Sequence, residues 1–399
     1  MSTGLDVKRV GDVIAGYRAH FEADDEIMLC SAPGRTEIGG NHTDHQHGCV
    51  LCAAVDRDMT AAVSMNRDGV IRLYSEGFGG LTVNTADLAA KKTERYTSSA
   101  LVRGLLSAFS EKGAALSGLD IYMRSDVPAG SGMSSSAAFE VLLGTAFNEA
   151  FHAGLSPLDI AKAGQYAENT YFGKPCGLMD QMASAFGGVL FIDFHDPQEP
   201  FVETISRTPE DMGISVCLID TGASHEGLTA DYAAVTAECR QVAKYFGKEV
   251  LADVRSEELL KEIPKLKGTV PDRAILRALH FFHETGRAKK EAEALKKGNS
   301  EEFLKLVRAS GKSSYELLQN VIPCGAAEHQ EMALALSLAE GILGEKGAVR
   351  VHGGGFAGTI QAFVPTKQRE EFAARMDGFL GKGSCRIVKV RREGGVLFR

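Results

Sequence analysis

The stretch VPAGSGMSSSAAFE, from Val127 to Glu140, constrains the fold of this chain more than any other. It follows an extended run at Ile121 to Asp126 and opens a helical pattern from about Ser134 to Phe151. A strand that enters a helix through a glycine and serine loop leaves backbone N–H groups unpaired beside the positive end of the helix dipole, and both favour a phosphate group. A serine cap on an ordinary helix is the alternative explanation. The loop matches neither GxxxxGK[ST] nor G-x-S-x-G, so it predicts neither a Walker loop nor a hydrolase nucleophile elbow.

Two further stretches contain more glycine than a structural turn requires. SAPGRTEIGGNHTDHQHGCVL, from Ser31 to Leu51, has a glycine-rich turn and then three histidines within six residues, which suggests either a metal cage or one wall of a substrate pocket. VHGGGFAGT, from Val351 to Thr359, predicts either a hairpin turn or a close approach of the backbone to a ligand. In GKPCGLMDQMASAFGG, Asp180 has no lysine or arginine within four residues, so it is either a cap or surface residue or a carboxylate with a distant partner.

The overall composition excludes several classes of protein. The 399 residues carry a net charge of -8 and give a pI near 5.8, which argues against an extended nucleic-acid surface. The N-terminus lacks a signal-peptide pattern and no run of about 18 apolar residues occurs, so we expect a cytosolic protein that does not enter a membrane. Eight cysteines are too sparse for a disulfide framework, and the C-x-x-C of Cys49 and Cys52 has no second pair to complete a zinc site.

The order of apolar runs and helical patterns predicts an α+β chain with two domains, residues 1–210 and 211–399. The boundary is placed near residue 210 because the polar connection DFHDPQEPFVETISRTPED follows a strand at 188–194. The second domain is expected to be a sheet with helices on one side. Further strands are expected at 50–62, 70–74, 121–126, 214–219, 349–352, 359–365 and 385–390, and further helices at 228–246, 271–297, 300–318, 326–344 and 368–380.

The four stretches, in this order, make the sequence similar to the galactokinase branch of the GHMP small-molecule kinases. APGR...IGGNHTDH resembles the family's galactokinase signature, VPAGSGMSSSAA its phosphate loop, CGLMDQ its catalytic-aspartate segment and VHGGGFAG its C-terminal glycine motif. The resemblance, from about residue 25 to 392, implies a two-domain GHMP kinase fold: a ribosomal-S5-domain-2-like N-terminal domain and a ferredoxin-like C-terminal domain, with the ATP and sugar sites between them. It implies transfer of the γ-phosphoryl group of ATP, with Mg2+, to the C1 hydroxyl of galactose. The expected partner is a small sugar, and the expected state is a monomer.

The resemblance also assigns roles by position. Asp180 becomes the catalytic base or electrostatic anchor for the C1 hydroxyl, and a paired Arg35 keeps it ionised and offsets charge in the transition state. Ser136 and Glu168 match the pair that coordinates magnesium, since one hydroxyl and one carboxylate leave room for phosphate oxygens and water. The positions that match the phosphate loop are Gly130, Ser131, Gly132, Ser134 and Ser135, and those that match the sugar site are Asn41, His42, Asp44 and Tyr232.

The sugar signature departs from the family's usual GRxNxIGEHTDY, because Asn41 replaces the glutamate before the histidine and His45 replaces the tyrosine. In the family that glutamate faces the sugar near its C6 hydroxyl. A neutral amide removes the repulsion against a C6 carboxylate and can donate to it, and His45-Gln46 also resembles the DHQ of plant-type galacturonokinases. Galacturonate is therefore the alternative to galactose, which an amide also accommodates. A second departure is the absence of an arginine pair after Tyr232, which can also alter substrate choice.

Two other classes of protein compete with the sugar kinase. A metal-dependent hydrolase rests on HTDHQH alone, whose spacing matches none of the zinc signatures. A non-catalytic sugar sensor built on a kinase fold is the second alternative. The joint presence of Asp180, Arg35, Ser136 and Glu168 argues against a sensor, which has no need of a complete phosphoryl-transfer set.

Overall fold

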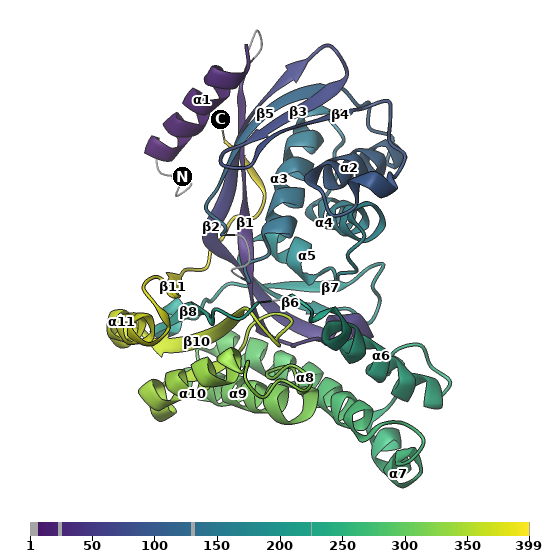
Figure 1. Ribbon diagram of the computed structural model, residues 1–399, viewed down its shortest axis with the longest axis vertical. Coiled ribbons are helices and arrows are strands. Elements are labelled where there is room, and N and C mark those ends of the chain that lie inside the picture. The colour runs from purple at the N-terminus through teal and green to yellow at the C-terminus, as the bar shows by residue number, and fades with distance from the viewer. Residues whose placement is uncertain (1–6, 23–25, 129–131, 225, 399) are drawn as a thin grey trace.

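The computed structural model describes residues 7–22, 26–128, 132–224 and 226–398, and it has two lobes, each built on its own sheet (Figure 1). The helices are α1 (Val7–His20), α2 (Ser98–Glu111), α3 (Ser135–Ala150), α4 (Pro157–Tyr166), α5 (Met179–Phe186), α6 (Thr229–Tyr245), α7 (Ser256–Leu266), α8 (Asp272–Lys297), α9 (Ser300–Ser313), α10 (Glu331–Leu343) and α11 (Arg369–Leu380). The strands are β1 (Met28–Gly39), β2 (Cys49–Asn66), β3 (Val70–Ser75), β4 (Gly79–Asn84), β5 (Gly118–Ser125), β6 (Val189–Asp193), β7 (Phe201–Ile205), β8 (Ile214–Asp220), β9 (Ala348–Val351), β10 (Thr359–Pro365), β11 (Cys385–Val388) and β12 (Val396–Phe398).

The first lobe contains an eight-stranded sheet in the order β12-β1-β2-β5-β3-β4, with β6 paired to β2 and β7 to β6. Helices α2 to α5 cover one face of this sheet, and α1 packs on the other (Figure 1). The long strand β2 lies at the centre, and its residues 49–55 and 58–64 are buried. The strands expected at 50–62, 70–74, 121–126 and 188–194 all appear within a few residues of their expected bounds.

The second lobe contains a four-stranded antiparallel sheet in the order β11-β8-β10-β9. Ala362 of β10 lies on the face that packs against α10 and α11. Its neighbour Phe363 lies on the opposite face, where its ring centroid is 5.3 Å from that of Phe303 on α9. The α+β class is confirmed, and the elements expected in the second lobe occur in the expected order, with the unexpected helix α7 between α6 and α8. The expectation of helices on one side is wrong for this sheet. Both sets of alternating side chains are apolar, so both faces are covered.

The segment that the sequence suggested to be a glycine-rich turn is largely strand β1. Pro33 and Gly34 have the chemistry of a turn, but the pairing of β1 with β2 on either side of them holds the chain extended. The pairing of β1 with β2 shifts register between Pro33 and Arg35, and such an irregularity accommodates a residue without an N–H donor. The prediction failed because strand pairing at long range outweighed local turn preference.

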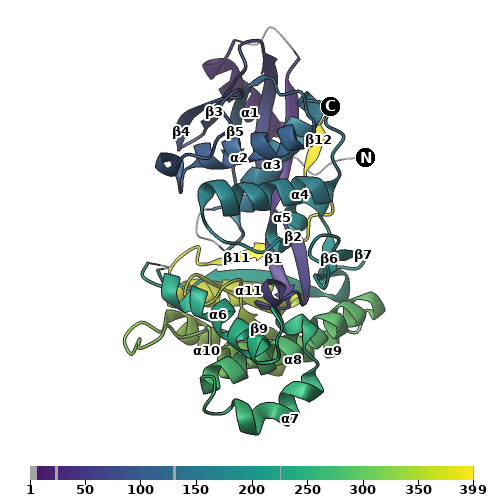
Figure 2. The same cartoon turned by 90° about the vertical axis from the view of Figure 1, so that its right-hand side faces the viewer.

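The change from one sheet to the other falls between β7 and β8, that is, between Ile205 and Ile214. The chain does not remain in the second lobe, because β12 returns to pair with β1 (Figure 2). Arg391, just before β12, donates to the side chains of Ser31 and Asp58. A two-domain division near residue 210 stays a prediction, and these contacts join the last residues to the first lobe.

The structure also bears on two further expectations, a metal or redox role for Cys49 and Cys52 and the lack of a membrane-spanning helix. Cys49 and Cys52 are buried in β2, and burial raises the pKa of the Cys49 thiol to about 12. A thiol that resists deprotonation is a poor metal ligand. Within the described ranges, no helix has both the length and the apolar character needed to cross a bilayer. A cytosolic location remains a prediction.

The return of the chain before β12 depends on a close contact at Gly394. A Cβ atom at this position would lie 2.1 Å from the carbonyl oxygen of Ala185, which is backbone and cannot rotate away. We expect Gly394→Ala to destabilise the protein by about 2 kcal/mol, the usual cost of overpacking. Gly378→Ala is the matched control, because Gly378 lies inside α11 with nothing within 4 Å of its Cβ position. Urea unfolding should show Gly378→Ala as stable as the parent or more stable by about 0.5 kcal/mol. If both variants changed the free energy of unfolding equally, the close contact at Gly394 would be contradicted.

Candidate active site

A buried ion pair between Arg35 and Asp180 lies at the centre of the candidate site. Arg35 is on β1 and Asp180 is the second residue of α5. Arg35 Nε donates to Asp180 Oδ1 and a terminal guanidinium nitrogen donates to Oδ2, each over 2.5 Å. The other terminal nitrogen donates to the carbonyl oxygen of Gly132. One arginine therefore holds both the aspartate and the end of the glycine and serine loop.

The electrostatics of this pair keep Asp180 ionised. Burial acts to raise the pKa of Asp180, but the Arg35 guanidinium and the hydroxyl of Ser134, which donates to Oδ2 over 2.7 Å, outweigh burial. The pKa of Asp180 therefore lies below its ordinary value. In the same way, burial acts to lower the pKa of Arg35, and Asp180 reverses the effect. The Asp180 side chain stays 27% exposed, so a ligand can reach the charged group.

The glycine and serine loop ends against this pair. Ser134 has a φ of 54°, and α3 begins at the next residue, Ser135. Gly34 permits the approach of the loop, because a Cβ there would lie 2.9 Å from the carbonyl oxygen of Met133. The N-terminus of α3 therefore lies beside Asp180, and a helix N-terminus is suited to an anion. Of the predicted phosphate-loop residues, Gly130 and Ser131 lie outside the described residues.

The predicted magnesium pair is also brought together. Ser136 lies on α3 and Glu168 lies on the π-helical segment Ala167–Phe172. Ser136 Oγ is 3.1 Å from Glu168 Oε1. Gln181 Nε2 donates to Glu168 and to Glu140, over 3.0 Å each. Burial, and then the neighbouring Glu168, raise the pKa of Glu140 well above its ordinary value, so Glu140 adds little negative charge. A hydroxyl and a carboxylate are hard oxygen donors of the kind that Mg2+ prefers.

The histidines of HTDHQH do not form a metal cage. Within the described ranges, no three side chains of histidine, cysteine, aspartate or glutamate are arranged to hold a metal ion. His42 Nε2 donates to the carbonyl oxygen of Gly354 over 2.9 Å, so this nitrogen carries the ring proton. Burial and then His45 lower the pKa of His42 to about 4, so the ring is neutral. The metal-dependent hydrolase has no support in this arrangement.

The predicted sugar residues surround the C-terminal glycine motif. Three successive carbonyl oxygens of the motif accept hydrogen bonds: Gly353 from Asn41 over 2.7 Å, Gly354 from His42, and Gly355 from Tyr232 over 2.8 Å. Asp44 lies against the catalytic-aspartate segment, because a Cβ at Gly177 would be 1.8 Å from Asp44 Oδ2. The structure therefore brings Asn41, His42 and Tyr232 to one backbone segment and Asp44 to the catalytic-aspartate segment.

Asn41 differs from the other sugar residues because it is fully buried. Its amide nitrogen donates to Glu37 Oε1 over 2.9 Å as well as to Gly353. Its amide oxygen accepts from Asn320 over 2.9 Å and from Ser314 over 3.4 Å. Two donors and two acceptor positions are all that an amide has, so no polar capacity of Asn41 is left for a sugar in this arrangement.

Sequence reasoning missed the carboxylate behind Asn41. Glu37 is buried and its Oε1 accepts from Arg350 over 2.5 Å. Burial raises the pKa of Glu37, and Arg350 opposes the rise. The family signature could have revealed the role of Glu37. It has asparagine at the position of Glu37 and glutamate at the position of Asn41. The chain has exchanged the two residues, and the amide still donates to the carboxylate.

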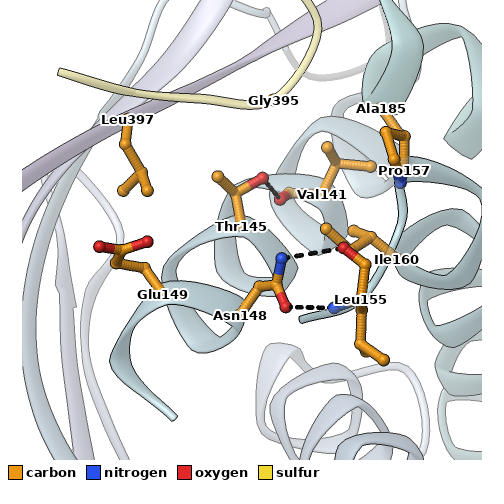
Figure 3. Close-up of a pocket in the computed structure, with 10 residues that line it drawn as sticks. All are labelled: Val141, Thr145, Asn148, Glu149, Leu155, Pro157, Ile160, Ala185, Gly395 and Leu397. Atoms are coloured by element: carbon orange, nitrogen blue, oxygen red, sulfur yellow. Dashed lines mark hydrogen bonds between the residues drawn. The ribbon is translucent and has the colours of Figure 1, made fainter. Parts of the chain in front are cut away.

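A cavity of about 200 Å3 lies away from these residues, between the second half of α3, α4 and the chain before β12 (Figure 3). Its lining contains none of the predicted site residues. Asn148 uses both ends of its amide on the backbone of Leu155, and Thr145 donates to the carbonyl oxygen of Val141. The polar groups of Asn148 and Thr145 thus serve the local structure.

Comparisons with known proteins identify the fold. Residues 100–188 match the family described as GHMP kinases N terminal domain, and residues 15–65 match the Galactokinase galactose-binding signature. Lactococcus lactis galactokinase complexed with galactose superposes with a TM-score of 0.84, covering 98% of this chain and 100% of that chain at 22% identity. A mevalonate kinase superposes with a TM-score of 0.62, covering 92% and 99% at 17% identity. The fold is that of a GHMP kinase.

Relatives with higher sequence identity show which GHMP kinase family the chain belongs to. The galactokinase of Actinobacillus pleuropneumoniae is 32% identical over 343 residues, which cover 85% of either chain. The galactokinase of Streptomyces coelicolor is 32% identical over 368 residues, covering 89% of this chain and 90% of the relative. The chain belongs to the galactokinase family.

The ion pair predicts how stability depends on pH. Asp180→Asn should lower the free energy of unfolding by about 2 kcal/mol at pH 7, because it leaves the buried Arg35 without its counter-charge. A carboxyl with a lowered folded pKa contributes stability above its unfolded pKa and loses it as the pH falls through the folded value. The difference between parent and variant should therefore be constant from about pH 8 to pH 5 and shrink below about pH 4. Urea unfolding across this range measures the difference, and a difference that does not shrink at all below pH 4 would contradict the ion pair.

Proposed function

We propose that the chain catalyses transfer of the γ-phosphoryl group of ATP to the C1 hydroxyl of galactose. The observation that carries the proposal is the Asp180 carboxylate, kept ionised by Arg35 and Ser134 and adjacent to the N-terminal turn of α3. A helix N-terminus attracts the phosphates, and the carboxylate accepts a hydroxyl beside them. The membership of the galactokinase family supports the same reaction.

The charges of the side chains suggest a role for each residue in the proposed reaction. Asp180 orients the sugar C1 hydroxyl and accepts its hydrogen bond; with a lowered pKa it is a weak base, which favours the role of electrostatic anchor. Arg35 offsets the charge that develops on the transferring group. Ser136 and Glu168 would hold Mg2+, which supplies charge neutralisation on the phosphates when bound. The helix end, Gly132, Ser134 and Ser135 bind the phosphates.

On the sugar side, Asp44, His42 and Tyr232 are the proposed contacts. Asp44 lies next to the catalytic-aspartate segment, and it accepts from the backbone N–H of His45 through Oδ1. The proton of His42 is used on Gly354, so its other ring nitrogen can only accept a hydrogen bond from a sugar hydroxyl. Asn41 acts through its neighbours, since Glu37, Gly353 and Asn320 occupy its amide.

Galacturonate remains the second candidate substrate, for one specific reason. The family signature has a carboxylate at position 41, whereas this chain has asparagine there and a carboxylate at Glu37. Arg350 neutralises the Glu37 carboxylate. A uronate at C6 would then meet no opposing charge from position 41. Galactose is favoured because the galactokinase relatives are 32% identical over most of the chain, and because residues 15–65 match the Galactokinase galactose-binding signature.

The reaction itself is tested by ATP consumption on addition of galactose. Asp180→Ala should lower kcat by about a thousandfold or more, because the transition state loses its anchor and Arg35 loses its partner. Asp272→Asn, an exposed residue at the start of α8, is the control that should keep parental activity. If the parent consumes no ATP with any aldose or uronic acid but still binds galactose, the protein is a sensor and the kinase proposal fails.

The substrate question is tested by exchanging the two signature residues. Asn41→Glu alone would place two carboxylates side by side, so the single variant should lose stability and activity on both sugars. The double variant Glu37→Asn with Asn41→Glu restores one carboxylate and one amide. If galacturonate is the substrate, kcat/KM for galacturonate should fall about tenfold more than kcat/KM for galactose in the double variant. Equal losses would dismiss galacturonate.

A further inference from the structure

Gln181 follows Asp180 in the chain, but its side chain contacts a different part of the site. It is the third residue of α5 and is fully buried. Its Nε2 donates to Glu168 Oε2 and to Glu140 Oε2, over 3.0 Å each, and Cys176 Sγ lies further away at 3.7 Å. Because the carboxylate of Glu168 can only accept, this end of the amide is the nitrogen. Its two hydrogens therefore join Glu168 to α3 through one side chain.

The two oxygens of the Glu168 carboxylate have different surroundings. Oε2 accepts from the buried amide of Gln181. Oε1 accepts from Ser136 over 3.1 Å and from Lys174 Nζ over 3.4 Å. The Lys174 side chain is 61% exposed, whereas that of Glu168 is 3% exposed. Oε1 therefore lies on the open side of the site, and Oε2 lies on the side of the core.

The backbone places Glu168 but does not fix the orientation of its carboxylate. Glu168 lies in the π-helical segment that follows α4, and its carbonyl oxygen accepts from the N–H groups of Gly173 and Lys174. Such wide turns occur frequently at functional sites. A glutamate side chain has several rotatable bonds, so holding it in one orientation costs conformational entropy. A hydrogen bond that orders the carboxylate in advance reduces this cost when a ligand binds.

The amide of Gln181 is itself held in place. Glu140, which accepts its second hydrogen bond, is fully buried on α3. Gly164 of α4 packs against both side chains, because a Cβ there would lie 3.0 Å from Glu140 Oε2 and 3.2 Å from Gln181 Cγ. Close packing of this kind leaves a side chain few alternative orientations. Gln181 can therefore transmit the rigidity of three packed helices to Glu168.

We propose that Gln181 is a positioning residue for Glu168 as a ligand of Mg2+. Its hydrogen bond to Oε2 fixes the carboxylate so that Oε1 stays beside Ser136, the other proposed ligand. Because Gln181 directly follows Asp180, one turn of α5 orders both the carboxylate that accepts the sugar hydroxyl and the carboxylate that would hold the metal. This inference rests on the proposed kinase function, since it takes ATP with Mg2+ as the ligand.

Gln181→Met tests the hydrogen bond, because methionine has a similar length and no N–H donor. Partners that orient metal ligands typically contribute about ten- to a hundredfold to metal affinity. We expect Gln181→Met to raise the Kd for ATP with Mg2+ about tenfold. The Kd for ATP in EDTA and the Kd for galactose should stay at the parental values, because the variant leaves the phosphate loop and the sugar residues intact.

Ser184→Ala is the matched control on the same helix. Ser184 is also fully buried, and its Oγ donates to the carbonyl oxygen of Pro33 over 2.6 Å. The alanine variant therefore loses a buried hydrogen bond of α5 without touching Glu168. It should bind ATP like the parent, with Mg2+ and in EDTA. If Ser184→Ala weakened binding only with Mg2+ and as much as Gln181→Met, general loosening of α5 would explain the effect and the inference would be overturned.

Isothermal titration with ATP and Mg2+, with ATP in EDTA, and with galactose measures these constants without turnover. If the parent does not bind ATP, the proposed function fails and the inference with it. If the parent binds ATP with Mg2+ and Gln181→Met binds it equally well, only the inference fails. Equal weakening with Mg2+ and in EDTA would also overturn the inference, because Gln181 would then support the nucleotide site without acting on the metal ligand.

Glu140 provides a second test if Gln181→Met unfolds. Glu140→Leu removes the acceptor that anchors the Gln181 amide, whereas the amide oxygen in Glu140→Gln can still accept from it. The leucine variant should raise the Kd for ATP with Mg2+ about threefold, and the glutamine variant should keep parental binding. Equal behaviour of the two Glu140 variants would overturn the inference, and thermal unfolding of each variant shows that the fold is intact.

Discussion

The ion pair of Arg35 and Asp180 is the interaction on which the rest of the site depends. It joins β1 to the start of α5, and through Gly132 and Ser134 it joins both to the glycine and serine loop. Two charges are stable at this depth only because each is met at short range by groups of matching geometry. The same contacts that compensate for burial leave Asp180 ionised and partly exposed beside a helix N-terminus. Structure and proposed chemistry therefore depend on one pair.

The C-terminal glycine motif connects this pair to the second lobe. Its carbonyl oxygens at 353–355 accept from three of the predicted sugar residues, so sugar signature and glycine motif form one hydrogen-bonded unit. Glycine is required where the packing is closest: a Cβ at Gly354 would lie 2.7 Å from the ring of Tyr232, and one at Gly355 would lie 2.2 Å from the Asn320 carbonyl oxygen. The motif connects the antiparallel strands β9 and β10, and its backbone also accepts hydrogen bonds from residues of the sugar signature.

Behind the motif lies a buried network of charged residues that sets the environment of the sugar signature. Arg350, fully buried, pairs with Glu37, and Glu284 accepts from the backbone of Gly40 and from Ser310. Burial acts to raise the pKa of Glu284, but His280, Arg287 and Arg350 lower it to about 2. Any change of charge in the signature is therefore felt by several buried groups at once. This is why the exchange of Glu37 and Asn41 has to be tested as a pair.

The sequence by itself determined the α+β class, the order of most strands and helices, and the four stretches that form the site, because periodicity and motif spacing are local properties of the chain. The resemblance to the galactokinase family also paired Asp180 with Arg35, whereas the residues around Asp180 left a cap or surface role open. Only the tertiary structure showed that Arg35, 145 positions away, donates two hydrogen bonds to this carboxylate. It alone showed that the turn-like Pro33 and Gly34 lie in a strand, and that the Asn41 amide is saturated by Glu37, Gly353, Asn320 and Ser314. Hydrogen-bond saturation and the pairing of buried charges depend on residues that folding brings together from far apart in the chain. No local pattern in the sequence contains that information.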